Sequence, residues 1–400
     1  MPPLDGRRIW FVGIGGAGLS GYALLAHAWG AEVAGWDRVE TPYLRSVREA
    51  GIPVTIDSAP GEPPAGWEVV VSTAFRDHFV AGSDPVTSRA AFLAELVSLR
   101  PSIVVAGAHG KSTTAAMIAF CLDRLGRDPS FLIGGEVPQL GGNARAGSGW
   151  LVAEGDESDR TIAALRPEIA VVTNFDLDHH SEFASRAEVE RLFEEWLEQA
   201  PQPVRGDELE PAELELAVPG EHNRHNAACA LAALGLADVP REEAEPVLRE
   251  FRGVGRRLEA KGEVGGVTVV DSYAHHPTEI AADLAAAGRG DRRLLVLFQP
   301  HLYSRTRHVA RELAASLATA DVVAVTDVYP AREQAVEGVT GKLVVDALAE
   351  LRPGMTIGWT PSVEEGAHFV ARRARPGDLV LTIGAGDVDR AVPLILEAVP

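Results

Sequence analysis

The sequence has 400 residues, of which 46% are hydrophobic and 24% are charged, and its formal net charge is −20 at pH 7. This length exceeds one ordinary hydrophobic core, so we expect a globular protein of two or three domains; the acidic balance argues against a nucleic-acid partner, which needs concentrated Lys and Arg. No apolar run reaches the roughly 20 residues that span a bilayer, and no secretory signal pattern opens the chain, so we expect no membrane insertion and a cytoplasmic location.

The first 97 residues predict a Rossmann-like domain. A strand leads into a glycine-rich turn and a helix, and a second strand then ends on Asp37. A glycine-rich turn after a strand, with an acidic residue about 20 positions further on, is typical of dinucleotide-binding units. The elements expected here are strands at residues 9–12, 32–36 and 68–72, and helices ending near residue 29 and covering residues 90–98.

The glycine motif leaves its ligand open. Gly13, Gly15 and Gly18 would let a phosphate approach the N-terminus of the following helix. NAD fits this pattern, and so does any other nucleotide diphosphate, including a UDP-sugar. The glycines could also serve packing alone.

Residues 98–254 carry a phosphate-binding loop at positions 107–114. A strand is expected at residues 102–106 before the loop, and a helix at residues 113–125 after it. Gly-x-x-Gly-Lys-Ser in this context places backbone N–H groups around the phosphates of ATP. Lys111 would neutralise the β- and γ-phosphates, and the Ser112 hydroxyl would bind Mg²⁺. Two residues separate Gly107 from Gly110 where four are usual, so the match to the common loop is partial.

Acidic residues follow two further strands of this segment, which we expect at residues 149–153 and 169–173. Residues 154–159 and 174–179 together hold six acids and a histidine. A single acid after a strand is usually a helix cap, but this number at two strand ends favours Mg²⁺ binding. Beyond them we expect helices at residues 188–200 and 225–236, separated by a loop over residues 201–219.

Residues 255–400 again alternate strands and helices. We expect strands at residues 267–270, 294–298, 322–326 and 379–383, with helices at residues 278–287 and 309–318. Residues 271–277 and 299–306 follow strands and are rich in His, Tyr and Arg, which suits a small anionic substrate and a ribose. The fold class is therefore α/β, with three domains at residues 1–97, 98–254 and 255–400.

Taken together, these motifs resemble those of the Mur ligases over nearly the whole chain. The matching stretches are residues 13–20, 107–113, 153–159, 173–179, 220–226, 253–257, 271–277 and 298–306. The resemblance implies a Rossmann-like domain for a UDP-sugar, a central P-loop ATPase domain with a mostly parallel sheet, and a Rossmann-like domain for an amino acid. Within the family it is nearest to the branch that phosphorylates the lactyl carboxylate of UDP-N-acetylmuramate with ATP and joins it to L-alanine.

The resemblance also implies roles for individual residues. Catalytic roles fall on Lys111, Glu154, His179 and Arg256, of which Arg256 would reach the γ-phosphate. ATP would be bound by Gly107, His109, Gly110, Lys111, Ser112, Thr113, His222, Asn223, Asn226 and Asp271. Mg²⁺ would be held by Ser112, Glu154 and His179. The UDP-sugar would be bound by Gly13, Gly15, Gly16, Gly18, Asp37 and Ser72, and L-alanine by Tyr273, His275, His301 and Arg305.

The sequence departs from the family pattern in three places. Ala108 and Ser112 stand where threonines are usual, although Ser112 keeps the hydroxyl. Leu302 replaces an arginine expected near the carboxylate of the amino acid, which leaves the choice of amino acid open. Residues 183–219 are shorter than in the family.

Other functions remain to be separated from the ligation of L-alanine. A murein-peptide recycling ligase would attach a peptide to the same sugar, and a non-catalytic paralogue would only bind UDP-sugar or ATP. An NAD dehydrogenase accounts for the first segment alone and leaves the phosphate loop unused. The sequence leaves the oligomeric state open between monomer and dimer.

Overall fold

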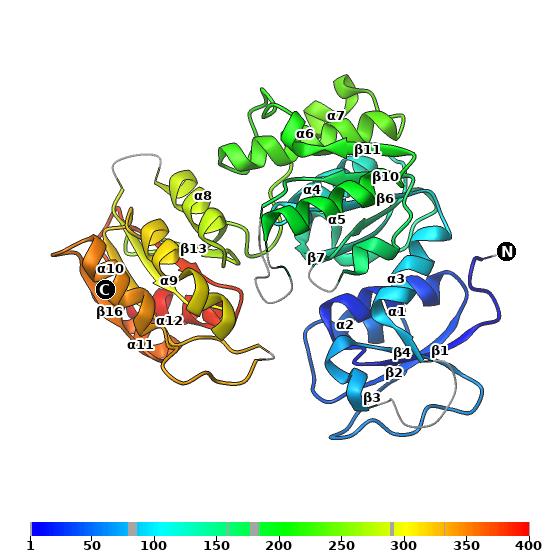
Figure 1. Cartoon of the computed structure of the whole chain (residues 1–400), viewed down its shortest axis with the longest axis horizontal. Helices are drawn as coiled ribbons and strands as arrows, with labels where there is room; N and C mark the ends of the chain where they lie inside the picture. The colour runs from blue at the N-terminus through cyan, green and yellow to red at the C-terminus, as the bar shows by residue number, and fades with distance from the viewer. Residues whose placement is uncertain are drawn as a thin grey trace. The chain divides into compact units, whose positions relative to one another are not determined.

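The computed structural model describes residues 2–78, 86–157, 160–176, 183, 185–288, 292–331 and 333–399. The chain packs into two compact units. The first unit comprises Met1–Asp176, Arg186–Ala217 and Arg224–Val254, and the second comprises Leu177–Ser185, Val218–Asn223 and Gly255–Pro400. Two sheets lie in the first unit and one in the second, and their strands are mostly parallel, which confirms the expected α/β class (Figure 1).

The N-terminal sheet has five parallel strands in the order β3-β2-β1-β4-β5. Its strands are β1 (Arg8–Val12), β2 (Glu32–Asp37), β3 (Val54–Ile56), β4 (Glu68–Val71) and β5 (Val86–Ser88). The helices beside it are α1 (Ala17–Ala28), α2 (Leu44–Glu49), η1 (Thr73–His78) and α3 (Arg89–Ser98). The strand order reverses between β1 and β4, and ligands of open parallel sheets bind at such reversal points.

The central sheet has six strands in the order β11-β10-β6-β9-β7-β8, and only the β7–β8 pair is antiparallel. The strands are β6 (Ser102–Ala106), β7 (Ser130–Val137), β8 (Gly142–Arg145), β9 (Leu151–Glu154), β10 (Ile169–Val172) and β11 (Gln202–Arg205). The helices are α4 (Lys111–Arg124), η2 (Pro138–Leu140), η3 (Thr161–Ala164), α5 (Arg186–Leu197), η4 (Gly206–Glu208), α6 (Glu221–Leu236) and α7 (Arg241–Leu248). Every residue of β6 is buried, and α4 follows it directly with a buried central run.

The expectation of a loop over residues 201–219 was wrong at its start, where β11 forms. This strand lies at the edge of the central sheet, parallel to β10, and Pro203 is in register with Ala170. Proline cannot donate a ladder hydrogen bond, so it suits an edge strand, where one side needs no donor. The proline-rich composition concealed a strand that completes the sheet.

The C-terminal sheet has six strands in the order β12-β13-β17-β14-β15-β16, of which only β12 is antiparallel to its neighbour. The strands are β12 (Glu259–Val264), β13 (Val267–Ser272), β14 (Leu294–Phe298), β15 (Val322–Val325), β16 (Thr356–Trp359) and β17 (Leu379–Ile383). The helices are α8 (Pro277–Ala287), α9 (Tyr303–Leu317), α10 (Lys342–Leu351), α11 (Val363–Ala371), η5 (Val388–Arg390) and α12 (Ala391–Ala398).

Both faces of the C-terminal sheet are covered. Successive side chains of a strand point to opposite faces, so Val296 packs in one core and Leu297 in the other. Helices α8, α9 and α10 contribute to the first core, and α11 and α12 to the second (Figure 1). This double coverage explains why β14 is a continuous apolar run in the sequence and why β17 has only one polar residue, Thr382.

Within the described part of the chain, no helix combines the length and apolarity that crossing a membrane requires.

Candidate active site

The glycine-rich turn lies between β1 and α1 in the N-terminal sheet, where the strand order reverses. Asp37, at the end of β2, accepts the Gly15 N–H with Oδ2 and the Arg38 N–H with Oδ1, each at 2.7 Å. The Thr41 hydroxyl donates to the Gly15 carbonyl at 2.7 Å. Asp37 therefore holds the turn in shape, because both of its oxygens accept backbone N–H groups.

Two glycines of this turn have no room for a side chain. A Cβ at Gly13, whose φ is +86°, would lie 2.9 Å from Ser72 Cβ and from the Phe75 ring. A Cβ at Gly15 would lie 2.9 Å from Asp37 Oδ2. The structure thus brings together the ends of β1, β2 and β4, as expected for the set Gly13, Gly15, Gly16, Gly18, Asp37 and Ser72.

The phosphate loop joins β6 to α4 and packs closely against the end of β10. Gly107 and Gly110 have φ angles of +126° and +80°, a region that favours glycine. A Cβ at Gly107 would lie 2.2 Å from Thr173 Oγ1, and one at Gly110 would lie 2.3 Å from Asn226 Oδ1. The loop conformation therefore requires glycine at both positions.

Residues around the loop fix its backbone. The His109 imidazole contacts Asp176 at 2.7 Å, and the Asn174 side-chain amide donates to the His109 carbonyl at 2.8 Å. Thr113 is buried in the first turn of α4. The sequence placed Asp176 and Asn174 at a strand end but assigned neither to the loop, since only the folded sheet brings β10 beside β6.

Lys111 is charged and held by a buried acid. Its Nζ donates to the Gly107 carbonyl at 2.6 Å and to Glu157 Oε1 at 3.0 Å. Burial lowers the pKa of Lys111, but Glu157, Asp156 and Glu154 outweigh it and hold the pKa above its usual value. Glu157, whose side chain is 2% exposed, is the partner that sequence analysis did not single out.

Two side chains with oxygen atoms that could bind a metal, Ser112 and Glu154, lie together beside Lys111. The Ser112 hydroxyl donates to Glu154 Oε2 at 2.9 Å, and Glu154 Oε1 accepts the Gly134 N–H. Hydroxyl and carboxylate oxygens are ligands that Mg²⁺ prefers, so this pair fits the metal. The third expected ligand, His179, lies outside the described residues, among which no group of three or more His, Cys, Asp or Glu side chains is placed to hold a metal.

In the second unit, Arg256 and Asp271 are engaged with each other. Arg256 Nε donates to Asp271 Oδ2 at 2.8 Å, and its two Nη groups donate to the carbonyls of Gly384 and Gly386. Asp271 is fully buried, and its Oδ1 accepts the Thr382 hydroxyl at 2.6 Å. Arg256 and Asp271 thus bond each other in this structure, and their expected roles in binding ATP stay predictions.

Four aromatic and imidazole rings form a row beyond the carboxyl ends of β13, β14 and β15. The centroids of Tyr273 and His275 are 5.7 Å apart, those of His275 and His301 also 5.7 Å, and His301 stacks on Tyr329 at 5.9 Å. The buried Arg305 lies 3.2 Å from His301 Nδ1. A guanidinium only donates, so this nitrogen of His301 is an acceptor. The four residues expected to face the amino acid are thus grouped, and Tyr329 joins them.

Leu302, the departure from the family pattern, has an unusual backbone. Its φ is +70°, and its N–H donates to the Tyr329 carbonyl at 2.9 Å. It is the N-cap of α9, whose Ser304 N–H donates to Glu333 at 2.9 Å. An internal carboxylate therefore sits at the N-terminus of α9, where the helix dipole favours negative charge.

Three residues expected to bind ATP lie in the first two turns of α6, namely His222, Asn223 and Asn226. In the second unit, His222 Nε2 lies 3.9 Å from Asp283 Oδ1, and the Asn223 amide donates to the Pro219 carbonyl at 2.6 Å. Burial, together with the positive charge of Arg257, lowers the pKa of His222, so the imidazole is neutral at pH 7. Asn226 belongs to the first unit and lies against Gly110.

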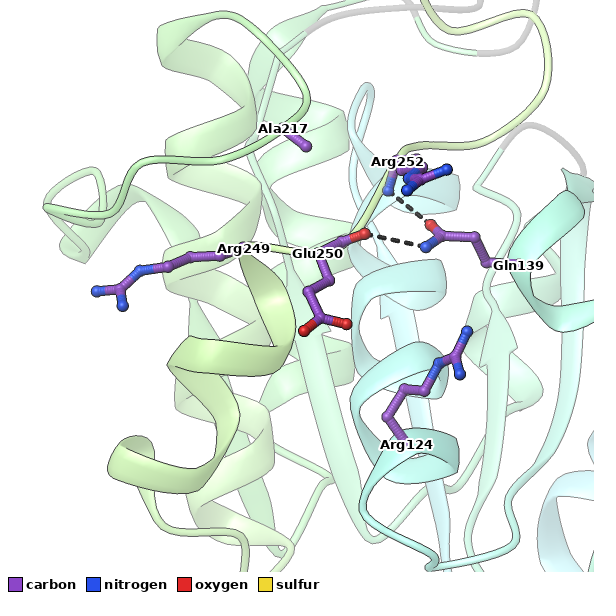
Figure 2. Close-up of a pocket in the computed structure, with 6 residues that line it drawn as sticks. All are labelled: Arg124, Gln139, Ala217, Arg249, Glu250 and Arg252. Carbon is purple, nitrogen blue, oxygen red and sulfur yellow. Dashed lines mark hydrogen bonds between the residues drawn. The ribbon is translucent and has the colours of Figure 1, made fainter.

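A pocket of about 470 Å³ in the first unit contains none of these residues. It is lined by Arg124, Gln139, Ala217, Arg249, Glu250 and Arg252. Gln139 bonds the backbone of Glu250 and Arg252, and Figure 2 shows the Arg249 side chain turned away from Arg124 and Arg252. The arginines do not converge on one point, and the Glu250 carboxylate opposes an anion there.

Comparison with known proteins identifies the family. The model described as "Mur ligase family, catalytic domain" matches residues 8–100, and "Mur ligase, glutamate ligase domain" matches residues 256–386. The UDP-N-acetylmuramate–L-alanine ligase of Streptomyces coelicolor is 42% identical, over 98% of this chain and 97% of the relative. The chain belongs to the Mur ligase family. The same-named protein of Streptomyces avermitilis is 39% identical, over 98% and 97% of the two chains.

Solved structures of Mur ligases share the fold. The UDP-N-acetylmuramate-alanine ligase of Thermotoga maritima matches with a TM-score of 0.79 and 26% identity, over 98% of both chains. A murein peptide ligase of Psychrobacter arcticus matches with a TM-score of 0.68 at 24% identity, over 98% of this chain and 99% of that one. The alignment to the Streptomyces coelicolor ligase covers 453 positions, so in at least 53 of them this 400-residue Mur ligase has a gap.

Proposed function

We propose that this Mur ligase joins L-alanine to the lactyl carboxylate of UDP-N-acetylmuramate, with ATP as the energy source, in cytoplasmic peptidoglycan precursor synthesis. The observation that carries the proposal is 42% identity over nearly the full length of a ligase of that name. The phosphate loop, the Ser112–Glu154 pair and the row of rings supply the groups that this reaction needs.

The central sheet would bind ATP. The loop N–H groups and Lys111 would hold the phosphates, which compete with Glu157 and the loop carbonyls for the ammonium group. Ser112 and Glu154, with His179, would hold Mg²⁺, which offsets the negative charge of the transferring phosphoryl group. Because a carboxylate and a phosphate are both anions, the positive charge of Lys111 is needed at the point where they meet.

The N-terminal sheet would bind the UDP-sugar at the turn before α1. Free N–H groups at the start of a helix attract a diphosphate, and Asp37 keeps the turn open for it. Gly13 and Gly15 allow the close approach that a side chain would block.

The row of rings would bind the amino acid. Arg305 is a buried cation that would hold the carboxylate of L-alanine. Tyr273, His275 and His301 would enclose its small side chain and leave the amine facing the acyl phosphate. The position of Leu302 at the start of α9 leaves one cation in this row, Arg305, among the residues that the resemblance assigns to the amino acid.

One assay tests the proposal. ADP release is measured with ATP, Mg²⁺ and UDP-N-acetylmuramate, with L-alanine, glycine, L-serine or L-Ala-γ-D-Glu-meso-diaminopimelate as the acceptor. The highest kcat/KM is expected with L-alanine. A preference for the tripeptide would favour the recycling ligase, the second candidate, and no turnover with any acceptor would contradict ligation altogether.

A further inference from the structure

Asp283 is a buried acid that none of the proposed roles uses. It lies on α8 with 9% of its surface exposed, and its Oδ2 accepts a hydrogen bond from the Ser272 hydroxyl. Its other oxygen lies 3.9 Å from the His222 ring. Burying an acidic side chain costs free energy unless a specific partner stabilises it. We therefore expect the contacts of Asp283 to serve a function.

Ser272 transmits the contact to the turn that follows β13. Its Oγ accepts the Ala274 N–H at 3.0 Å, which fixes the backbone on either side of Tyr273. The residue before Ser272 is Asp271, which holds Arg256, and the Tyr273 N–H in turn donates to the Arg256 carbonyl at 2.6 Å. The Ser272 hydroxyl thus bonds both α8 and the backbone of this turn. We call residues 271–276 the acceptor turn.

A second acid on α8 braces the other end of the acceptor turn. Glu279 accepts the His275 N–H at 3.1 Å and pairs with Arg257 at 3.3 Å. Glu279 and Asp283 are four residues apart, so they lie on the same face of α8. The helix therefore contacts the acceptor turn through two carboxylates, one at each end of the segment that carries Tyr273 and His275.

We propose that Asp283 is a positioning residue that, through Ser272, holds Tyr273 and His275 in the geometry that binds the amino-acid acceptor. The inference rests on the proposed function for its substrate, but the bond between α8 and the turn is independent of it. Asp283 itself touches no substrate. Its removal acts through the backbone of the acceptor turn, while the phosphate loop in the first unit keeps its conformation.

The test combines steady-state kinetics with amide hydrogen exchange on the full-length protein. D283A and S272A each remove one side of the bond, and D283N is the matched control, because an asparagine amide can still bond the hydroxyl. We expect D283A and S272A to raise the KM for the acceptor that the wild type uses by about tenfold, as loss of a buried hydrogen bond predicts. The KM for ATP should change less than about twofold, and D283N should retain most of the wild-type affinity.

Hydrogen exchange separates this inference from the proposed function. Amides of residues 271–276 should exchange faster in D283A and S272A than in the wild type and D283N, whether or not L-alanine is the acceptor. Amides of residues 107–114 should be unchanged. Because S272A also removes the bond from the Ala274 N–H, the double variant S272A/D283A should show little more effect than S272A alone.

Three results would overturn the proposal. Unchanged exchange in the acceptor turn of S272A would show that the bond does not hold it. Faster exchange with an unchanged acceptor KM would show that the bond serves stability alone. An equal rise in the KM for ATP would show a general loss of structure. If D283A does not fold, unchanged exchange in S272A still overturns the proposal, because S272A removes the same contact with Asp283.

Discussion

Lys111 carries a positive charge and is held by a buried acidic partner. Replacing Lys111 therefore tests the role of the phosphate loop. K111A should lower kcat for ADP release by roughly 10²–10³-fold, the loss found when one charge-stabilising group is removed from a reacting centre. The exposed Lys342, which pairs with Asp346 on α10, provides the control K342A, for which near wild-type kcat is expected. Full activity in K111A would refute the role of the phosphate loop.

The Ser112–Glu154 pair predicts a change in metal requirement. S112A removes one of two neighbouring oxygens, so the Mg²⁺ concentration for half-maximal activity should rise by about tenfold or more. S112T keeps the hydroxyl and should behave as the wild type. Titration of activity with Mg²⁺ at saturating ATP measures the difference, and identical curves for S112A and S112T would exclude Ser112 as a ligand.

Asp283 should also make stability depend on pH. Burial raises its pKa from 3.8 to about 7; the Ser272 bond and Arg257 oppose this rise, and Glu279 adds to it. Burial also lowers the pKa of the facing His222. Between pH 4 and pH 7 the folded state therefore keeps a proton on Asp283 that the unfolded state has lost. The free energy of unfolding falls as the pH rises through that range. D283N cannot titrate, so its stability relative to the wild type should be higher at pH 8 than at pH 5 in urea unfolding. A difference that is the same at both pH values would contradict the shift.

At the scale of elements, strands buried on both faces could be predicted from the sequence. β6, β14 and β17 are buried and almost wholly apolar, with only Ser102 and Thr382 polar among them, because helices cover both sides of their sheets. β12 and β11 could not be predicted in this way. β12 is an exposed antiparallel strand with alternating charged residues, and β11 is an edge strand that contains a proline. Edge strands bury too little surface to leave an apolar pattern.

The candidate site was predictable only in part, for a related reason. Lys111, Ser112 and Glu154 follow strands, and the rule that ligands bind at carboxyl strand ends places them near one another. Their partners depend on how strands pair, so the contacts of Lys111 with Glu157 and of Ser272 with Asp283 could not be read from spacing. The mutual pairing of Arg256 and Asp271 is likewise a tertiary contact.

The phosphate loop as an element predicts a steric effect. G107A would place a Cβ 2.2 Å from Thr173 Oγ1 at a positive φ, so both stability and ATP-dependent turnover should fall sharply. Gly235, inside α6, has open space within 4 Å of the position that a Cβ would take, and G235A should raise stability by about 0.5–1 kcal/mol. Thermal unfolding and ADP release are measured for both variants. Equal stability and equal turnover of G107A and G235A would contradict the prediction.

At the scale of the molecule, neither compact unit is a single continuous stretch of the sequence. The second unit takes the short segment Val218–Asn223 from between two stretches of the first. That segment contributes His222, which faces Asp283 within the second unit. The unit that would select the amino acid is therefore discontinuous in sequence.

This discontinuity bears on how such proteins exchange parts by recombination. A single crossover at residue 254 would transfer the acceptor turn and α8 from one parent but leave residues 218–223 from the other. If the two parent proteins differ at His222 or Asp283, the recombinant would then pair residues that come from different parents at these two positions, even if each parent is active. Amino-acid preference should be inherited cleanly only when both stretches come from the same parent.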